Sequence, residues 1–298
     1  MTNPEFKILP WNGYQAAISL TFDDGDPSQL ETAIPALAKR RLRGTFFLIA
    51  NRIKNLEDWK DAVQTGQEIG NHTLDHKHGW ILSPAEAVEQ VLSSREKLEQ
   101  LLGVSTPTFA YPFTEITPDL RQTAEKHHFL SRGGYGSVYM QAQNQPDWHY
   151  LASQVAYAHT SSGILKGWTD HNIYNHTWSI PQFHAFTGSQ TGWQPLSPVK
   201  FDDFLDDLVE KKNQIWVGTL GEVGAYWQAQ DILENTIGNS ENGSIVWNWK
   251  KPALMPAGTK LKIKVSNAQN VYQKNRLLES TPAGIYTVSF DDQELKIN

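Results

Sequence analysis

The two acidic residues in TFDDG (residues 21–25) are the first place in the chain where side chains could do chemistry. Two adjacent carboxylates repel each other unless a cation or two distinct roles separate them. The segment ends an apolar, strand-like run, and α/β folds build their sites at the carboxyl ends of parallel strands. A turn there can direct both Asp23 and Asp24 into one cleft, although Asp-Asp-Gly by itself is only a turn signal.

A pair of histidines follows in NHTLDH (residues 71–76), where His72 and His76 lie four residues apart. Two histidines at this spacing can reach one metal ion if the backbone is helical or tightly turned, but in a chain with ten His such a pair also arises by chance. Together with Asp24 they form a His₂-Asp set, which is typical of a catalytic divalent ion with one position left open for water. We expect zinc. His78 is off this spacing and is expected at the surface.

Two other segments place polar residues among apolar ones: FAYPF (residues 109–113) and PQFH (residues 181–184). Taken alone, the first is a loop and the second is a strand with a core histidine. Neither predicts a site without a further constraint.

The elements that must position these residues alternate between strands and helices. AAISLTF (residues 16–22) and GTFFLIA (residues 44–50) are short apolar runs that predict buried parallel strands. A helix is expected from Ser83, where Ser-Pro-Ala-Glu supplies a capping box, and Gly103 ends it. Such alternation over ~200 residues predicts an α/β barrel or a doubly wound sheet.

The pattern changes near residue 231. KLKIKV (residues 260–265) and GIYTVSF (residues 284–290) alternate strictly between polar and apolar residues, and turn-rich segments separate them from other short strands. We therefore expect a catalytic domain over residues 1–230 and a small antiparallel β domain over residues 231–298. Trp247 and Trp249 lie on one face of a predicted strand. We expect them to form a packing surface, and a sugar-binding platform is the alternative.

Composition excludes several kinds of partner. The net charge is −6, no Lys/Arg-rich run is present, and there is no cysteine, which argues against nucleic acid, anionic membranes and thiol chemistry. No apolar stretch reaches the ~18 residues of a membrane span. MTNPEFKILPW has no signal-peptide pattern. We expect either a cytoplasmic location or an extracytoplasmic one after removal of a leader, and composition leaves the oligomeric state open.

The order and spacing of the motifs resemble the polysaccharide deacetylase family, which is also the NodB-homology domain or carbohydrate esterase family 4. TFDDG matches the family's first motif, and NHTLDH matches its His-(Ser/Thr)-x-x-His metal motif. GTFFLIANRI, QEIGNHT and IWVGTLGEVGAY support the match, which covers about residues 11–230. The resemblance implies a distorted (β/α) barrel, followed here by a small β-sandwich-like domain.

The resemblance also implies roles for individual residues. The residues that it assigns to the metal are Asp24, His72 and His76. It makes Asp23 the catalytic base, His184 the catalytic acid, and the Phe113 backbone N–H a donor to the oxyanion.

The family's Arg-x-Pro-(Tyr/Phe) motif is only partly matched, because Ala110 stands where the arginine would be. That arginine normally pairs with the base. Arg132 is our candidate replacement, since it ends an apolar, strand-like run, FLSRGG (residues 129–134), whose carboxyl end would point into the same barrel mouth. The alternative is a surface arginine before a flexible loop.

The expected function is that of a metal-dependent hydrolase that removes acetyl groups from an N-acetylated or O-acetylated glycan. The 11 Trp, 10 Tyr and 12 Phe are compatible with sugar stacking, although tryptophan also fills the cores of large barrels. Two alternatives stay open. One is a metal amidohydrolase acting on a non-sugar C–N bond, and the other is a catalytically inactive carbohydrate-binding protein.

Overall fold

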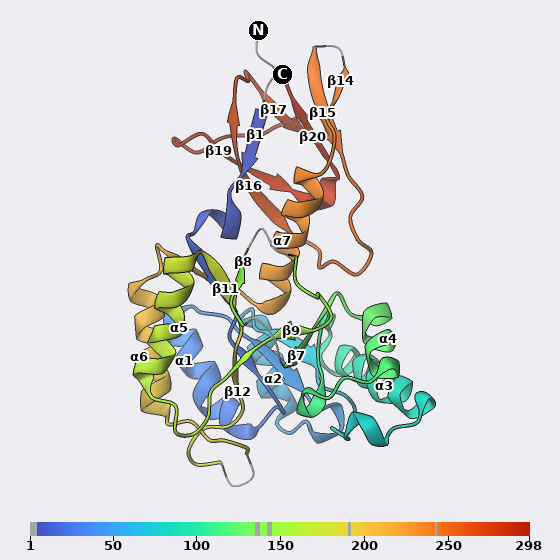
Figure 1. Cartoon of the computed structure of the whole chain (residues 1–298), viewed down its shortest axis with the longest axis vertical. Helices are drawn as coiled ribbons and strands as arrows, with labels where there is room; N and C mark the ends of the chain where they lie inside the picture. The colour runs from blue at the N-terminus through green and yellow to red at the C-terminus, as the bar shows by residue number, and fades with distance from the viewer. Residues whose placement is uncertain (1–4, 135–137, 142–144, 190–191, 242) are drawn as a thin grey trace. The chain divides into compact units, whose positions relative to one another are not determined.

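The computed structural model describes residues 5–134, 138–141, 145–189, 192–241 and 243–298 (Figure 1). It divides into two compact units. One consists of Gln15–Gly221, and the other combines the segment up to Tyr14 with Glu222–Asn298. The expected boundary at residue 230 stays a prediction about the extent of the catalytic domain. The structural division falls at Gly221, and the first strand belongs to the C-terminal unit.

An eight-stranded, all-parallel sheet forms a nearly closed barrel in the larger unit. Its strands, in spatial order, are β10 (Gln154–Val155), β12 (Pro181–Phe183), β3 (Thr21–Phe22), β4 (Thr45–Leu48), β5 (Glu68–Asn71), β6 (Thr108–Ala110), β7 (Leu130–Gly134) and β9 (Leu151–Ala152). This confirms the expected (β/α) barrel class. All four residues of β4 are buried, as expected for a parallel strand that is covered on both faces.

The predicted strand over residues 16–22 is divided in two. Its first half, β2 (Ala16–Ile18), belongs to a four-stranded sheet with β13 (Ile215–Val217), β11 (Thr177–Ser179) and β8 (Met140–Gln141), whereas β3 belongs to the barrel. Between the halves, the Ser19 N–H donates to the carbonyl of Ser179 and the Leu20 carbonyl accepts from Thr45. The apolar run is continuous in sequence but changes sheet at this point, which its composition does not reveal.

Helices accompany the strands of the larger unit (Figure 1). They are α1 (Ile34–Arg40), α2 (Leu56–Gln64), α3 (Pro84–Leu102), α4 (Pro118–His127), α5 (Ser162–Asn175) and α6 (Pro198–Glu210). The predicted capping box is present, with Ser83 and Glu86 bonded reciprocally, and Gly103 ends α3 in a left-handed conformation. A π-helix spans Gln29–Ala33, and short 3-10 helices span Ala50–Arg52, Gly79–Ile81 and Pro112–Thr114.

Aromatic rings fill much of the barrel core. Phe22 stacks on Phe46 at 4.5 Å and on Phe183 at 5.3 Å between ring centroids. Phe201 from α6 packs edge-on against Phe22. Trp59 and Trp178 are also fully buried, so in these two positions tryptophan serves the core rather than a sugar.

The smaller unit contains two antiparallel sheets, which confirms the expected C-terminal β structure. One is formed by β1 (Glu5–Ile8), β16 (Lys260–Ser266) and β19 (Ile285–Ser289). The other is formed by β14 (Asn239–Glu241), β15 (Ser244–Asn248), β20 (Glu294–Ile297), β17 (Val271–Gln273) and β18 (Arg276–Leu277). Helix α7 spans Leu220–Glu234, and short 3-10 helices span Pro10–Gly13 and Phe290–Asp292.

Trp247 and Trp249 are both buried in the smaller unit. Trp247 packs edge-on against Phe6, and Trp249 stacks on Phe290. They therefore build the core of this unit and do not offer a sugar-binding platform. Within the described ranges, no helix combines the length and the apolar character that a membrane crossing needs.

Candidate active site

Asp23 and Asp24 directly follow β3, and the backbone turns sharply at this point. The Asp23 N–H continues the barrel ladder by donating to the carbonyl of Phe183. Asp24 and Gly25 then adopt left-handed φ angles of 75° and 66°. A Cβ at Gly25 would lie 2.9 Å from the Leu48 side chain, so glycine is required here both for its backbone and for space. The turn separates the two carboxylates, with Asp23 buried and Asp24 partly exposed.

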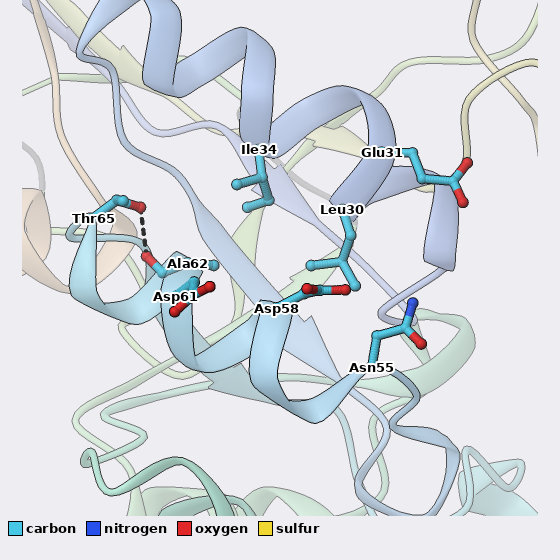
Figure 2. A pocket seen from close by; sticks show the side chains of 8 residues that line it. All are labelled: Leu30, Glu31, Ile34, Asn55, Asp58, Asp61, Ala62 and Thr65. Atoms are coloured by element: carbon cyan, nitrogen blue, oxygen red, sulfur yellow. Dashed lines mark hydrogen bonds between the residues drawn. The ribbon is translucent and has the colours of Figure 1, made fainter.

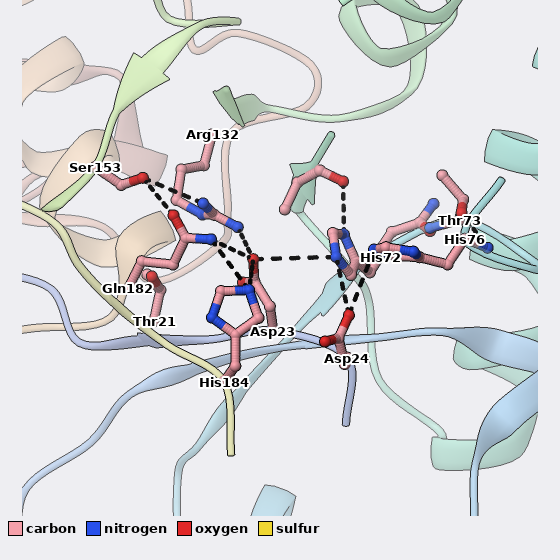
Figure 3. Close-up of polar contacts among 12 residues, drawn as sticks. Thr21, Asp23, Asp24, His72, Thr73, His76, Arg132, Ser153, Gln182 and His184 are labelled. Atoms are coloured by element: carbon pink, nitrogen blue, oxygen red, sulfur yellow. Dashed lines mark hydrogen bonds and ion pairs between the residues drawn. The ribbon is translucent and has the colours of Figure 1, made fainter. Parts of the chain in front are cut away.

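Three side chains converge as a potential metal site. His72 Nε2 and His76 Nε2 lie 3.5 Å and 3.4 Å from the same oxygen of Asp24 (Figure 3). The ligand atoms of Asp24, His72 and His76 all lie within 4.8 Å of one another. Two imidazole nitrogens and one carboxylate oxygen at this separation are a donor set that fits a divalent ion such as Zn²⁺.

The two histidines meet through a tight turn and not through a helix. His72 follows β5 directly, and Thr73 and His76 have φ angles of 65° and 59°. The Thr73 hydroxyl accepts a hydrogen bond from the His76 N–H at 3.0 Å, which closes the turn. The sequence left open whether the backbone would be helical or turned. The left-handed conformations of Thr73 and His76 show that it is a turn.

Buried polar groups orient His72. Its Nδ1 lies 2.8 Å from the carbonyl oxygen of Ala110, which can only accept, so Nδ1 carries a proton and Nε2 is the nitrogen that faces Asp24. Behind it, the Asn71 amide donates to the Val91 carbonyl and accepts from the Ser94 hydroxyl. The strand end that carries His72 is therefore anchored to α3.

The electrostatics of this group suit metal binding. Burial, and after it the neighbouring His72, lower the pKa of His76 to about 4. Burial alone would raise the pKa of Asp24, but the hydrogen bond and charge of His72 outweigh it and hold this pKa below its usual range. Asp24 is therefore ionised and His76 neutral at pH 7, which are the protonation states that bind a metal.

Asp23 lies on the other side of the cavity in a network of buried donors. The guanidinium of Arg132, from β7, donates through Nη2 to Asp23 Oδ2 (Figure 3). Arg132 is 1% exposed and its guanidinium lies over the Phe47 ring. The structure thus places Arg132 in direct contact with Asp23 and not at the surface.

His184 follows β12 and approaches Asp23 from the opposite direction to Arg132. Its Nε2 lies 3.7 Å from Asp23 Oδ2, and its ring packs edge-on against Trp193 at 4.5 Å. Its Nδ1 is buried without a partner among the described residues. Burial lowers the pKa of His184, and Asp23 opposes this effect.

Phe113 lies at the mouth of the cavity, where it is 48% exposed. It has a left-handed φ of 56°, and its ring stacks on His78 at 3.9 Å between centroids. His78 donates through Nδ1 to the Glu115 carboxylate at 2.9 Å and does not belong to the metal group.

One cavity of about 640 Å³ joins these residues. Six of the sequence-predicted residues line it: Asp23, Asp24, His72, His76, Phe113 and His184. Arg132 lies behind Asp23 and does not line it. Sequence reasoning assigned no role to the other lining residues, which include Ser153, Tyr157, Gln182 and Trp193. Gln182 alone had a signal, because it lies two residues before His184 on a strand and therefore on the same face.

A second cavity of about 410 Å³ lies between α2 and the segment that leads into α1 (Figure 2). Three carboxylates line it, those of Glu31, Asp58 and Asp61. Among the residues that the structure describes, only Asp24, His72 and His76 form a group that could hold a metal ion. The chemistry therefore concentrates at the barrel cavity.

Part of the chain matches a known protein family and several curated proteins. Residues 12–130 match the family model described as polysaccharide deacetylase. A peptidoglycan-N-acetylglucosamine deacetylase of Bacillus cereus is 30% identical over 135 residues, covering 44% of this chain and 60% of that protein. A gellan lyase of a Bacillus species is 27% identical over 255 residues, covering 78% of this chain but 10% of that protein. The chain spans less than half the length of the first curated relatives that it matches.

Solved structures share the barrel fold. An acetyl xylan esterase of family 4 from Clostridium thermocellum, in complex with a cobalt ion, matches with a TM-score of 0.50 at 19% identity, covering 70% of this chain and 89% of that one. BA3943 of Bacillus anthracis, a CE4 family pseudoenzyme, matches with a TM-score of 0.50 at 20% identity. The match covers 70% of this chain and 65% of that one. These matches confirm the resemblance to the polysaccharide deacetylase family that the motifs predicted. That family comprises carbohydrate deacetylases and esterases, together with pseudoenzymes.

Proposed function

We propose that the protein is a metal-dependent hydrolase that removes acetyl groups from an acetylated carbohydrate. One observation carries the proposal: the Asp24, His72 and His76 group lines the same cavity as a buried carboxylate, Asp23, and a histidine, His184. A metal site with a candidate base and a candidate acid beside it is the constellation that hydrolysis of an unactivated acyl bond requires.

Asp24, His72 and His76 would hold the ion, and the two-nitrogen, one-oxygen donor set suits zinc. The ion would lower the pKa of a bound water molecule from ~15.7 toward ~7, and it would polarise the acetyl carbonyl. The Ala110 carbonyl fixes the ring of His72 through Nδ1, and the Thr73 hydroxyl fixes the turn that carries His76.

In this proposal Asp23 is the general base. As water attacks the acetyl carbonyl, a bond forms between the water oxygen and the carbonyl carbon, and Asp23 accepts the proton that the water loses. The contact with Arg132 holds the carboxylate in one orientation. Arg132 thereby takes the place that the arginine missing at Ala110 would fill.

The tetrahedral oxyanion receives a hydrogen bond from the Phe113 backbone N–H, a kind of contact worth roughly 3–4 kcal/mol. His184 then donates its proton to the leaving nitrogen or oxygen as the bond to the carbonyl carbon breaks. Because burial lowers the pKa of His184, its protonated form is a stronger acid than an exposed histidine. The products are acetate and a sugar with a free amine or hydroxyl.

The named relatives support a glycan as the substrate. The curated relatives include deacetylases of peptidoglycan and of chitooligosaccharides, and a solved neighbour is an acetyl xylan esterase. The same residues serve an amide and an ester. Both N-acetylated and O-acetylated glycans are therefore proposed substrate classes.

The test is acetate release by the zinc-loaded protein from chitin oligomers, peptidoglycan fragments, acetylated xylan and acetylated pectin, with His72→Ala as the control. Release from at least one glycan by the wild type alone supports the proposal. Hydrolysis of simple N-acetyl amides without any glycan activity would instead identify a non-sugar amidohydrolase. A metal-loaded protein that is inactive on every substrate would identify a pseudoenzyme.

A further inference from the structure

The side chain of Gln182 contacts the base but has no role in the function proposed above. Gln182 lies on β12, two residues before His184, and is 4% exposed. Its Nε2 donates to Asp23 Oδ2 at 2.8 Å, the same oxygen that accepts from Arg132 (Figure 3). The other end of its amide, Oε1, accepts from the Ser153 hydroxyl at 2.7 Å.

Ser153 closes the network into a ring. Arg132 donates through Nη1 to Ser153 Oγ at 3.2 Å and through Nη2 to Asp23, so both arms of the guanidinium end on members of the same group. The four residues Asp23, Arg132, Ser153 and Gln182 are all at least nine-tenths buried. Water therefore does not compete with these bonds, and their directions are strongly fixed.

The ring treats the two oxygens of Asp23 differently. Oδ2 accepts from both Arg132 and Gln182, and it also lies 3.7 Å from His184 Nε2 and 4.0 Å from His72 Nε2. Oδ1 is buried and has no hydrogen-bond partner within the described part of the chain. A buried carboxylate oxygen without a donor is costly, and because Oδ1 has none among the described residues, the hydrogen bonds from Arg132 and Gln182 to Oδ2 are the ones that hold this carboxylate.

We propose that Gln182, oriented by Ser153, is a positioning residue that fixes the carboxylate of Asp23 through Oδ2. The inference rests on the proposed function, because Asp23 is the base proposed there. Gln182 acts through Asp23, and its own atoms take no proton.

An amide is suited to this position because it donates at one end and accepts at the other. The Ser153 hydroxyl selects which end faces Asp23, since the hydroxyl proton must meet the amide oxygen. Gln182 Nε2 also lies 3.5 Å from His184 Nε2, so the amide is close to both the candidate base and the candidate acid. A leucine would fill the same space without donating, and a glutamate would place a second carboxylate against Asp23.

The first experiment compares Gln182→Leu and Gln182→Glu with wild type in acetate release by the zinc-loaded protein. Loss of an orienting partner is expected to lower kcat about 10–100-fold with KM and zinc content unchanged, and Gln182→Glu is expected to lose more. Gln154→Leu is the matched control, because Gln154 is also a buried glutamine, lies on the adjacent strand β10 and does not line the cavity. A raised KM with unchanged kcat would overturn the positioning role in favour of direct substrate contact.

Ser153 provides a rescue test. Ser153→Ala removes the donor that orients the amide and is expected to lower kcat, whereas Ser153→Thr keeps a hydroxyl and is expected to retain most of it. Equal kcat values for wild type, Ser153→Ala and Gln182→Leu would overturn the proposal.

A second readout does not need activity or metal. In NMR spectra of the metal-free protein, the side-chain amide signals absent from Gln182→Leu are expected to exchange slowly with water and to shift in Asp23→Asn and Ser153→Ala. A Gln182 amide that exchanges freely, or that is unmoved by both substitutions, would refute the network. If the wild type released no acetate, the proposed function would fail, and this measurement would still decide whether Gln182 holds Asp23.

Discussion

The two sides of the barrel cavity are built in different ways. The metal side is made of turns, in which left-handed residues bring Asp24 and His76 to their places, and both side chains stay partly exposed. The base side is made of strand ends, and Asp23 and Arg132 are almost completely buried in a closed set of hydrogen bonds. An ion and its waters must enter and exchange, whereas a base must keep one orientation. Each side therefore has the construction that its proposed task requires.

The largest effect is expected on the metal side. His72→Ala removes a ligand that has no substitute among its neighbours, and we expect it to lose both zinc and measurable acetate release. His78→Ala is the control, since His78 is nearby but outside the metal group. Zinc content by elemental analysis, measured with the rate, checks both. Full zinc occupancy in His72→Ala would show that the ligand assignment is wrong.

On the base side, Asp23→Asn is expected to keep zinc and to lose the proton acceptor. Removal of a general base typically lowers the rate about 10²–10⁴-fold. Zinc content and kcat measured on the same preparation separate the two sides of the cavity. A near wild-type kcat would remove Asp23 from the mechanism.

His184→Ala sharpens the comparison within the base side. An amine needs its proton to leave, whereas p-nitrophenolate does not, so we expect a loss of about 10²-fold or more on an N-acetyl sugar and a smaller loss on p-nitrophenyl acetate. Equal losses on the two substrates would count against His184 as the acid.

Arg132→Lys tests whether Asp23 needs a guanidinium or only a positive charge. A lysine cannot reach Asp23 and Ser153 together, so we expect a kcat about 10–100-fold lower with zinc retained. Arg121→Lys is the matched control, because Arg121 forms its ion pair with Asp147 at the surface. Wild-type kcat in Arg132→Lys would contradict the orienting role.

The last prediction concerns stability in acid and lies furthest from the chemistry, at a histidine that supports the metal side. His128 Nε2 lies 3.1 Å from Nδ2 of Asn71, which can only donate, so this histidine must be neutral, and burial lowers its pKa to about 3. The contribution of neutral His128 to the free energy of unfolding is therefore complete above the ordinary histidine pKa of ~6.5. It declines as the pH falls toward 3, by at most about 1.4 kcal/mol per pH unit. Urea unfolding from pH 7 to 4 should show a shallower decline in His128→Asn than in wild type. Parallel curves would argue against this linkage.

The sequence predicted the elements whose signals are local. The helix from Ser83 to Gly103 carries its own cap and stop, and the family motifs identified the barrel. The expected strand over residues 16–22 was wrong in its continuity, because the change of sheet depends on partners at Ser179 and Thr45 that no local pattern encodes.

The candidate site follows the same rule. Asp23, Asp24, His72 and His76 belong to two compact motifs, so their types and spacing were enough to select them. Gln182 and Ser153 were missed because their contacts join residues 159 and 29 positions apart. The two-residue spacing places Gln182 on the same face as His184, but it does not say whether that face meets a base or a core.

The strand order of the barrel has a mechanical consequence. β9 and β10 are the two outermost strands of the eight, yet Ser153 alone separates them in the chain. The residue that bridges the free edges of the sheet is thus the one that bonds both Arg132 and Gln182. The junction of the two edge strands and the hydrogen bonds that orient the Asp23 carboxylate therefore depend on the same residue. We expect that a change in how these two strands are joined would also change the orientation of Asp23.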